Sequence, residues 1–223
     1  EANTGIGNYA LANNTTSDFN TAVGYQALYT STTGSNNTAV GKDSMFANTT
    51  GAENTAVGFS ALNDNTTGSN NVAIGRAALG DNTTGSRNTA TGHNSLRLNA
   101  TGTQNTAYGD FALYNSTVNY NTGIGFSALS NVTTGTQNTG LGRLAGSGLT
   151  TGTSSTFLGY YARPSSATQS SANVIGNAVV GVGGYTTLGV STSDIRALHG
   201  NVTWATVSDE RYKKDIEHST AGL

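Results

Sequence analysis

Residues 54–70 read NTAVGFSALNDNTTGSN, and this seventeen-residue pattern returns along most of the chain. The opening pentapeptide, or a close variant of it, begins at Asn3, Asn20, Asn37, Asn54, Asn71, Asn88, Asn105, Asn121 and Asn138, and looser copies begin at Ser155 and Ala172. One step is sixteen residues, from Asn105 to Asn121, where the unit lacks the Gly that closes the others. A fixed period of this length indicates a repeat architecture.

Within each unit the Asn is counted as position one, so that a small residue followed by Leu or Met falls at positions eight and nine, as in Ala61-Leu62. Seventeen residues are too few for a helix-turn-helix unit, but they hold two short strands, one around NTAVG and one around the small-Leu pair. The sequence therefore predicts an all-β protein, a parallel β-solenoid (β-roll) of about eleven coils. Strands stacked about 4.8 Å apart would make a rod about 50 Å long.

The repeat also predicts which positions face inward. We expect the apolar residues at position four, such as Val57, and the Leu residues at position nine, such as Leu62, to line the interior. Small residues at position three, such as Ala56, are then expected on the outer face, where another backbone could approach closely. The Asn at position one either forms an amide ladder from coil to coil or terminates a turn, and the ladder is favoured.

Each coil supplies only about two sizeable apolar side chains, a thin core to offset the entropy of ordering the chain. Hydrophobic residues make up 35% of the sequence and charged residues only 10%. Self-association would compensate for the thin core, and three parallel copies around an axis are one such packing. We expect a homotrimer, although periodicity alone leaves two copies equally open.

NTAVGxxAL units joined by NTTG turns resemble the head domains of trimeric autotransporter adhesins and the related β-roll repeats of phage tail fibres. The similarity covers residues 3 to about 180. The resemblance implies three chains forming parallel coils, at a bacterial cell surface or on a virion. The repeat of seventeen is longer than in the adhesin heads used for comparison.

The repeat decays after Gly176, and composition changes sharply near the C-terminus. We divide the chain into a solenoid head (1–190), a β-rich neck (191–207) and a charged segment (208–223). The charged segment opens with SDERYKKDI, which is similar to the start of the intramolecular chaperone of phage endosialidases and tail fibres. That resemblance implies self-cleavage at Ser208-Asp209, with Ser208 as nucleophile and Lys213 as its base.

Composition excludes several function classes. The net charge is −2 with scattered basic residues, so no nucleic-acid surface is expected. The chain has no Cys and three isolated His residues, so we expect no metal site and no cofactor. No apolar run approaches the roughly 18 residues that span a bilayer.

These observations predict a non-enzymatic, extracellular fibre or adhesin segment that projects a surface-binding function. Positions six and seven differ most between coils, so contacts with a glycan or protein receptor are expected there, at Tyr25, Phe59 and His93. Two alternatives stay open. One is an ice-binding solenoid that uses the stacked Thr pairs of the TTG turns, and the other is the precursor of a self-cleaving fibre.

Overall fold

A computed structural model describes residues 2–191, 193–200 and 204–206. These residues form a 14-stranded sheet and a two-stranded sheet, without a helix. The strands are β1 (Thr4–Ile6), β2 (Thr21–Val23), β3 (Thr38–Val40), β4 (Thr55–Val57), β5 (Val72–Ile74), β6 (Thr89–Thr91), β7 (Thr106–Tyr108), β8 (Thr122–Ile124), β9 (Thr139–Leu141), β10 (Thr156–Leu158), β11 (Arg163–Pro164), β12 (Asn173–Asn177), β13 (Val180–Gly181), β14 (Tyr185–Val190), β15 (Ser193–Leu198) and β16 (Trp204–Thr206).

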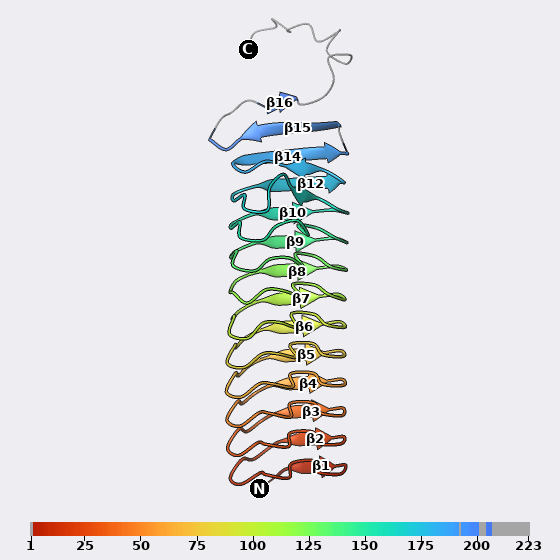
Figure 1. The fold of residues 1–223 in the computed structure, drawn as a ribbon, viewed down its shortest axis with the longest axis vertical. Helices are drawn as coiled ribbons and strands as arrows, with labels where there is room; N and C mark the ends of the chain where they lie inside the picture. The colour runs from red at the N-terminus through yellow and green to blue at the C-terminus, as the bar shows by residue number, and fades with distance from the viewer. Residues whose placement is uncertain (1, 192, 201–203, 207–223) are drawn as a thin grey trace, which may run out of the picture.

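Each coil of the chain adds one strand on top of the previous one, which produces a rod (Figure 1). The strands pair in parallel with equivalent residues aligned, for example Val40 beside Val57 and Val57 beside Ile74. From β14 onward the pairing becomes antiparallel, first with β15 and then between β15 and β16. The predicted parallel β-solenoid of about eleven seventeen-residue coils is therefore confirmed.

The Gly at position five turns the chain after every strand of the repeat. Gly24 has φ of 136°, a backbone conformation that residues with a Cβ atom rarely adopt. A Cβ atom at Gly24 would also lie 2.5 Å from the carbonyl oxygen of Gly41 in the next coil. Backbone conformation and close stacking thus both require Gly here.

The interior is lined by position three, and the prediction that position four points inward is wrong. Ala56 is fully buried, whereas 36% of Val57 is exposed. Neighbouring residues of a strand point to opposite faces, so the burial of one excludes the other. The small residue lies inside because the Leu at position nine of the preceding coil packs against it: a Cβ on Gly140 at position three would lie 2.8 Å from Leu129 Cγ. The prediction that the Leu at position nine is buried is confirmed.

A second regular strand around the small-Leu pair was also expected, and the structure has none. Ala61 and Leu62 are both fully buried, although adjacent strand residues cannot face the same side. Positive φ angles of 52° at Ser60 and at Leu62 bend the chain so that both side chains enter the core. Coils still bond to each other here, since the Leu62 N–H donates to the Ala78 carbonyl at 2.9 Å.

The predicted Asn ladder at position one is confirmed from Asn3 to Asn138. In a typical step the backbone N–H of Asn71 donates to Asn54 Oδ1 at 2.9 Å, and Asn71 Nδ2 donates to the Gly85 carbonyl at 2.9 Å. A second ladder at position twelve was not predicted. It links Asn48, Asn65, Asn82 and Asn99 through amide hydrogen bonds of 2.8, 2.8 and 3.0 Å.

The last coils close the end of the core. Thr187 in β14 is fully buried and pairs with Arg196 of β15. Arg196 Nη2 lies 3.0 Å from the buried carboxylate of Asp194 and donates to the Val180 carbonyl at 3.3 Å. The Arg196–Asp194 ion pair therefore lies over the end of the buried core.

Candidate functional site

The structure aligns Tyr25, Phe59 and His93 in one column at position six, on the corner of the rod beyond the Gly turn. Between the two aromatic residues lies Lys42, whose Nζ is 5.8 Å from the Tyr25 ring centroid and 5.2 Å from that of Phe59. Arg76 lies over Phe59 at 5.8 Å and contacts His93 Nε2 at 3.3 Å through Nη1. Cations thus alternate with rings along the column, at distances where ring faces attract positive charge.

The position-six column continues toward the C-terminus in the same way. The His93 backbone N–H donates to Asp110 Oδ1 at 3.0 Å. Further along, the Arg143 guanidinium lies 5.5 Å from the ring centroids of both Phe126 and Tyr160. Lys42, Arg76 and Arg143 were not among the predicted binding residues. The sequence repeat shows which residue type occupies each position, but it does not show that a cation in one coil contacts a ring in the next.

The outward-facing residues at position four form a second column, which is apolar except for Thr91. In register order it comprises Ile6, Val23, Val40, Val57, Ile74, Thr91, Tyr108, Ile124, Leu141, Leu158 and Ile175, and Leu188 and Ile195 continue it. Exposure along it reaches 60% at Ile6 and at Tyr108. The column carries no charged residue. Soluble monomers rarely expose a continuous apolar surface of this extent.

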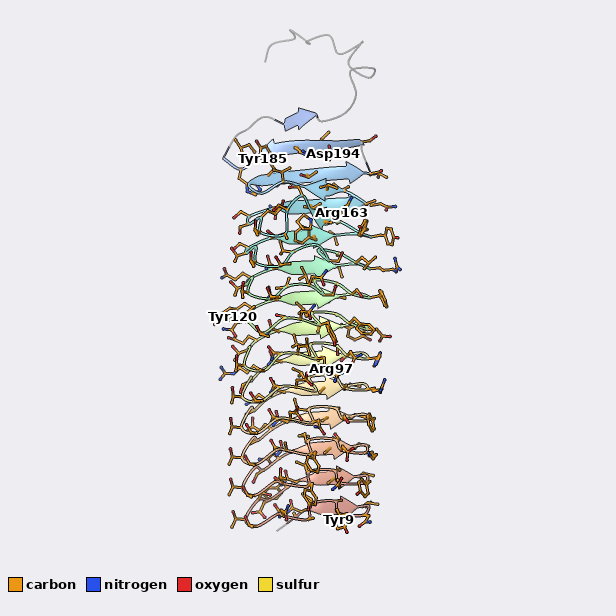
Figure 2. All side chains as sticks on the ribbon, viewed as in Figure 1. Tyr9, Arg97, Tyr120, Arg163, Tyr185 and Asp194 are labelled. Atoms are coloured by element: carbon orange, nitrogen blue, oxygen red, sulfur yellow. The ribbon has the colours of Figure 1, made fainter. Side chains whose placement is uncertain are left out.

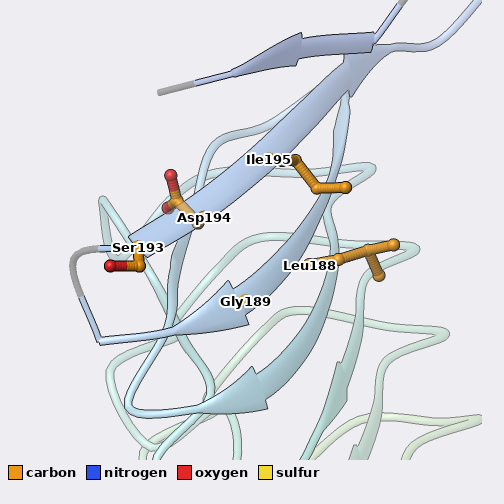
Figure 3. A pocket seen from close by; sticks show the side chains of 5 residues that line it. All are labelled: Leu188, Gly189, Ser193, Asp194 and Ile195. Carbon is orange, nitrogen blue, oxygen red and sulfur yellow. The ribbon is translucent and has the colours of Figure 1, made fainter. Parts of the chain in front are cut away.

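A pocket of about 430 Å³ lies at the C-terminal end of the position-four column, where β14 and β15 meet (Figure 3). Leu188 and Ile195 line one side of it, and Ser193 and Asp194 line the other. Asp194 is already engaged by Arg196. We read this pocket as the end of the apolar surface, since Leu188 and Ile195 belong to that column.

The predicted self-cleavage residues Ser208 and Lys213 lie outside the described residues, so their roles stay a prediction. Within the described part of the chain, no group of three or more acidic or His side chains could hold a metal ion. No helix long and apolar enough to cross a bilayer occurs in that same part.

The stacked Thr pairs do not present two free rows of hydroxyl groups. At position thirteen the hydroxyl bonds to the next coil: Thr49 Oγ1 donates to the Thr66 carbonyl at 2.9 Å, and Thr66 Oγ1 donates to the Thr83 carbonyl at 3.0 Å. In most pairs only the second Thr is exposed, such as Thr50 or Thr67, while both residues are exposed at Thr133-Thr134. This arrangement does not favour an ice-binding face.

A groove lies on a further face of the rod, between position seven, where contacts were expected, and position ten, which the sequence analysis did not single out. Its walls are Gln26, Asp43, Phe46 and Asn63. The sequence does show that side-chain size changes from coil to coil at these positions, for example from Phe46 to Asn63. A consensus of all the repeats does not contain this change. Comparisons with protein-family models, with curated protein sequences and with solved structures give no match.

Proposed function

We propose that this chain is a segment of an extracellular fibre or adhesin, in which three copies lie parallel and pack through their position-four columns. The fibre would belong to a phage tail or a bacterial surface, as the resemblance of the repeat implies. It acts mechanically, by projecting binding surfaces, and catalyses no reaction on a substrate.

The observation that carries this proposal is the exposed position-four column itself. Burying aliphatic side chains contributes roughly 25 cal/mol per Å² of apolar surface removed from water. The column runs through every coil in unbroken register and continues into β14 and β15. A straight apolar column fits the equivalent column of a parallel copy along its whole length, whereas a globular partner would cover only a part of it.

Packing through position four also supports a binding role for the remaining faces. Alternation along each strand puts Ala56 inside and Val57 outside, and Leu62 is buried with Ala56 in the core. The side of the rod that carries the groove of positions seven and ten contributes no wall residue to the position-four column. Three copies of a weak contact on that side would act together through effective concentration.

The native mass tests the assembly. Sedimentation equilibrium or light scattering is expected to give about three times 22.6 kDa for the purified chain. The double variant Val57→Lys/Ile74→Lys places two charges in the column, where burial without a partner is unfavourable. It is expected to shift the protein to the mass of a single chain.

The matched control is Gln104→Lys/Gln137→Lys, which adds the same charge at two exposed residues of position seventeen. Arg87 already occupies this position in another coil, so the backbone accepts a long cation there. The control is expected to keep the native mass. A wild-type chain that is monomeric at high concentration, or a Lys double variant that stays trimeric, would contradict the proposal.

A further inference from the structure

The groove between positions seven and ten exists because side chains become smaller from one coil to the next. At position ten the column changes from Tyr29 and Phe46 to the shorter Asn63, and position seven carries Gln26 and Asp43 beside it. The space left above Phe46 amounts to about 270 Å³. A third ring at position ten, in place of Asn63, would fill this space.

An aromatic stack forms one end of this groove. The rings of Tyr29 and Phe46 are parallel, with 2° between their planes and 5.2 Å between centroids. Tyr9 meets both Tyr25 and Tyr29 edge-on, at 6.1 and 6.2 Å. These contacts fix the stack from below, while the next residue of the column above Phe46 is Asn63. The stack therefore ends at Phe46, which borders the groove.

The polar groups of the groove carry no net charge. Lys42 Nζ lies 2.7 Å from Asp43 Oδ2 and neutralises that carboxylate. Asn63 Nδ2 donates to Asp64 Oδ1 at 2.5 Å, which leaves the Asn63 carbonyl oxygen as an acceptor. The Gln26 side-chain amide makes no hydrogen bond within the described residues, and it offers both a donor and an acceptor.

We propose that this groove binds a neutral pyranose residue of a surface polysaccharide. The electron-rich face of Phe46 attracts the polarised C–H groups on one side of a sugar ring. Asp43, Asn63 and Gln26 meet the ring hydroxyls with acceptors and a donor. A sugar ring continues the Tyr29–Phe46 stack by one layer, which is the place that the missing ring leaves open.

The groove's composition also selects the class of ligand. A phosphate, sulfate or uronate would need an unpaired cation, and Lys42 beside the groove is already paired with Asp43. A purely apolar ligand would leave the Gln26 amide and the Asn63 side-chain carbonyl oxygen without partners. The inference deepens the proposed surface-binding function and rests on it for the source of the sugar.

Saturation-transfer NMR on the purified chain tests the site, with glucose, galactose, mannose and N-acetylglucosamine as separate probes. At least one sugar is expected to bind, and Phe46→Leu is expected to weaken that binding at least tenfold. Leu keeps apolar volume against Tyr29 but has no ring face. Asp43→Asn removes the charged acceptor and is expected to weaken binding about fivefold.

Two matched controls separate the groove from the rest of the surface. Tyr120 is an exposed ring that projects from the left edge of the rod in Figure 2, and Tyr120→Ala is expected to leave the affinity within twofold. Glu53→Gln changes one exposed carboxylate outside the groove and is expected to do the same. Absence of binding by all four sugars, or equal losses in Phe46→Leu and Tyr120→Ala, would overturn the proposal.

The native mass of the same samples distinguishes this inference from the proposed function. If the protein is a trimer but binds none of the sugars, the sugar site is overturned and the proposed fibre function is unaffected. A monomer that binds a sugar with the expected loss in Phe46→Leu supports the site and overturns the fibre.

Discussion

The early coils and the late coils fill the same interior in different ways. Up to residue 115, position twelve is mostly Asn, and the buried amides bond to each other from coil to coil. In later coils the same position carries Val132 and then Leu149, both fully buried. Position three changes as well, from Ala to Phe157 and Val174. Position twelve is thus polar and hydrogen-bonded in one stretch of the core and apolar in the other, while the buried Asn ladder at position one continues to Asn138 in the later coils.

The two kinds of side chain at position twelve place different requirements on the adjacent coils. An amide is satisfied only when the adjacent coils also present amides, whereas apolar residues need only complementary shapes. At the junction, Asn99 Oδ1 and Ser116 Oγ are buried without a hydrogen-bond partner among the described residues. The transition therefore leaves two unsatisfied groups where one kind of core meets the other.

The largest effect is expected for Phe157→Ala in the apolar part of the core. Phe157 packs where position nine of the previous coil is Gly146: a Cβ on Gly146 would lie 2.8 Å from Phe157 Cδ2. Removing a buried Phe side chain leaves a cavity and costs about 4 kcal/mol of unfolding free energy. Urea unfolding at fixed protein concentration measures the loss.

The second half of this test adds Gly146→Leu to Phe157→Ala. Gly146 has φ of 66°, close to the 59° of Leu144 and the 51° of Leu129, so Leu is compatible with the backbone. Its Cβ would lie 2.5 Å from Leu129 Cδ2, the end of a flexible side chain that has to shift to admit it. The double variant restores the ordinary Leu of position nine and is expected to regain about 2 kcal/mol over Phe157→Ala. If it is no more stable than the single variant, the two residues do not compensate each other.

Much of this core could be predicted from the sequence, because period and residue size were enough to give the coil, its length, the buried Leu and the first Asn ladder. The direction of position four could not. Val57 is larger and more apolar than Ala56, and residue type alone puts the larger one inside. The opposite holds because Leu62 already fills the narrow coil, and this limit on space appears only once the chain is closed into a coil.

Other features were hidden for a different reason. Asn is a common turn residue, so its presence in the NTTG turn needed no further explanation. The buried ladder that links Asn48 and Asn65 was therefore not predicted. The groove at Phe46 arises from one coil differing from the next, and averaging over repeats removes that information. Functional surfaces on a repeat protein therefore have to be sought in the departures from the repeat.

Among the early coils, Asn71→Ala breaks the position-one ladder in the middle. It removes the acceptor of the Asn88 N–H at 3.0 Å and the donor to the Gly85 carbonyl at 2.9 Å. Both groups are buried, and leaving them unpaired is expected to cost about 3 kcal/mol. Thermal and urea unfolding measure this, with Asn177→Ala, an exposed Asn at position six, as the control. If Asn71→Ala lowers the unfolding free energy no more than the control does, water replaces the hydrogen bonds of the ladder at no cost in stability.

The smallest effect is expected at the junction itself, for Ser116→Asn. An Asn side chain there extends the position-twelve ladder by one step, and its Nδ2 can reach Asn99 Oδ1, as each earlier Asn reaches the one before it. Satisfying one buried acceptor is expected to stabilise the fold by about 1 kcal/mol. Ser130→Asn, at the partly exposed position ten, is expected to be neutral. A loss of stability for Ser116→Asn alone would mean that the sixteen-residue coil has no room for an amide, and that its shortened turn, rather than the change of residue type, ends the ladder.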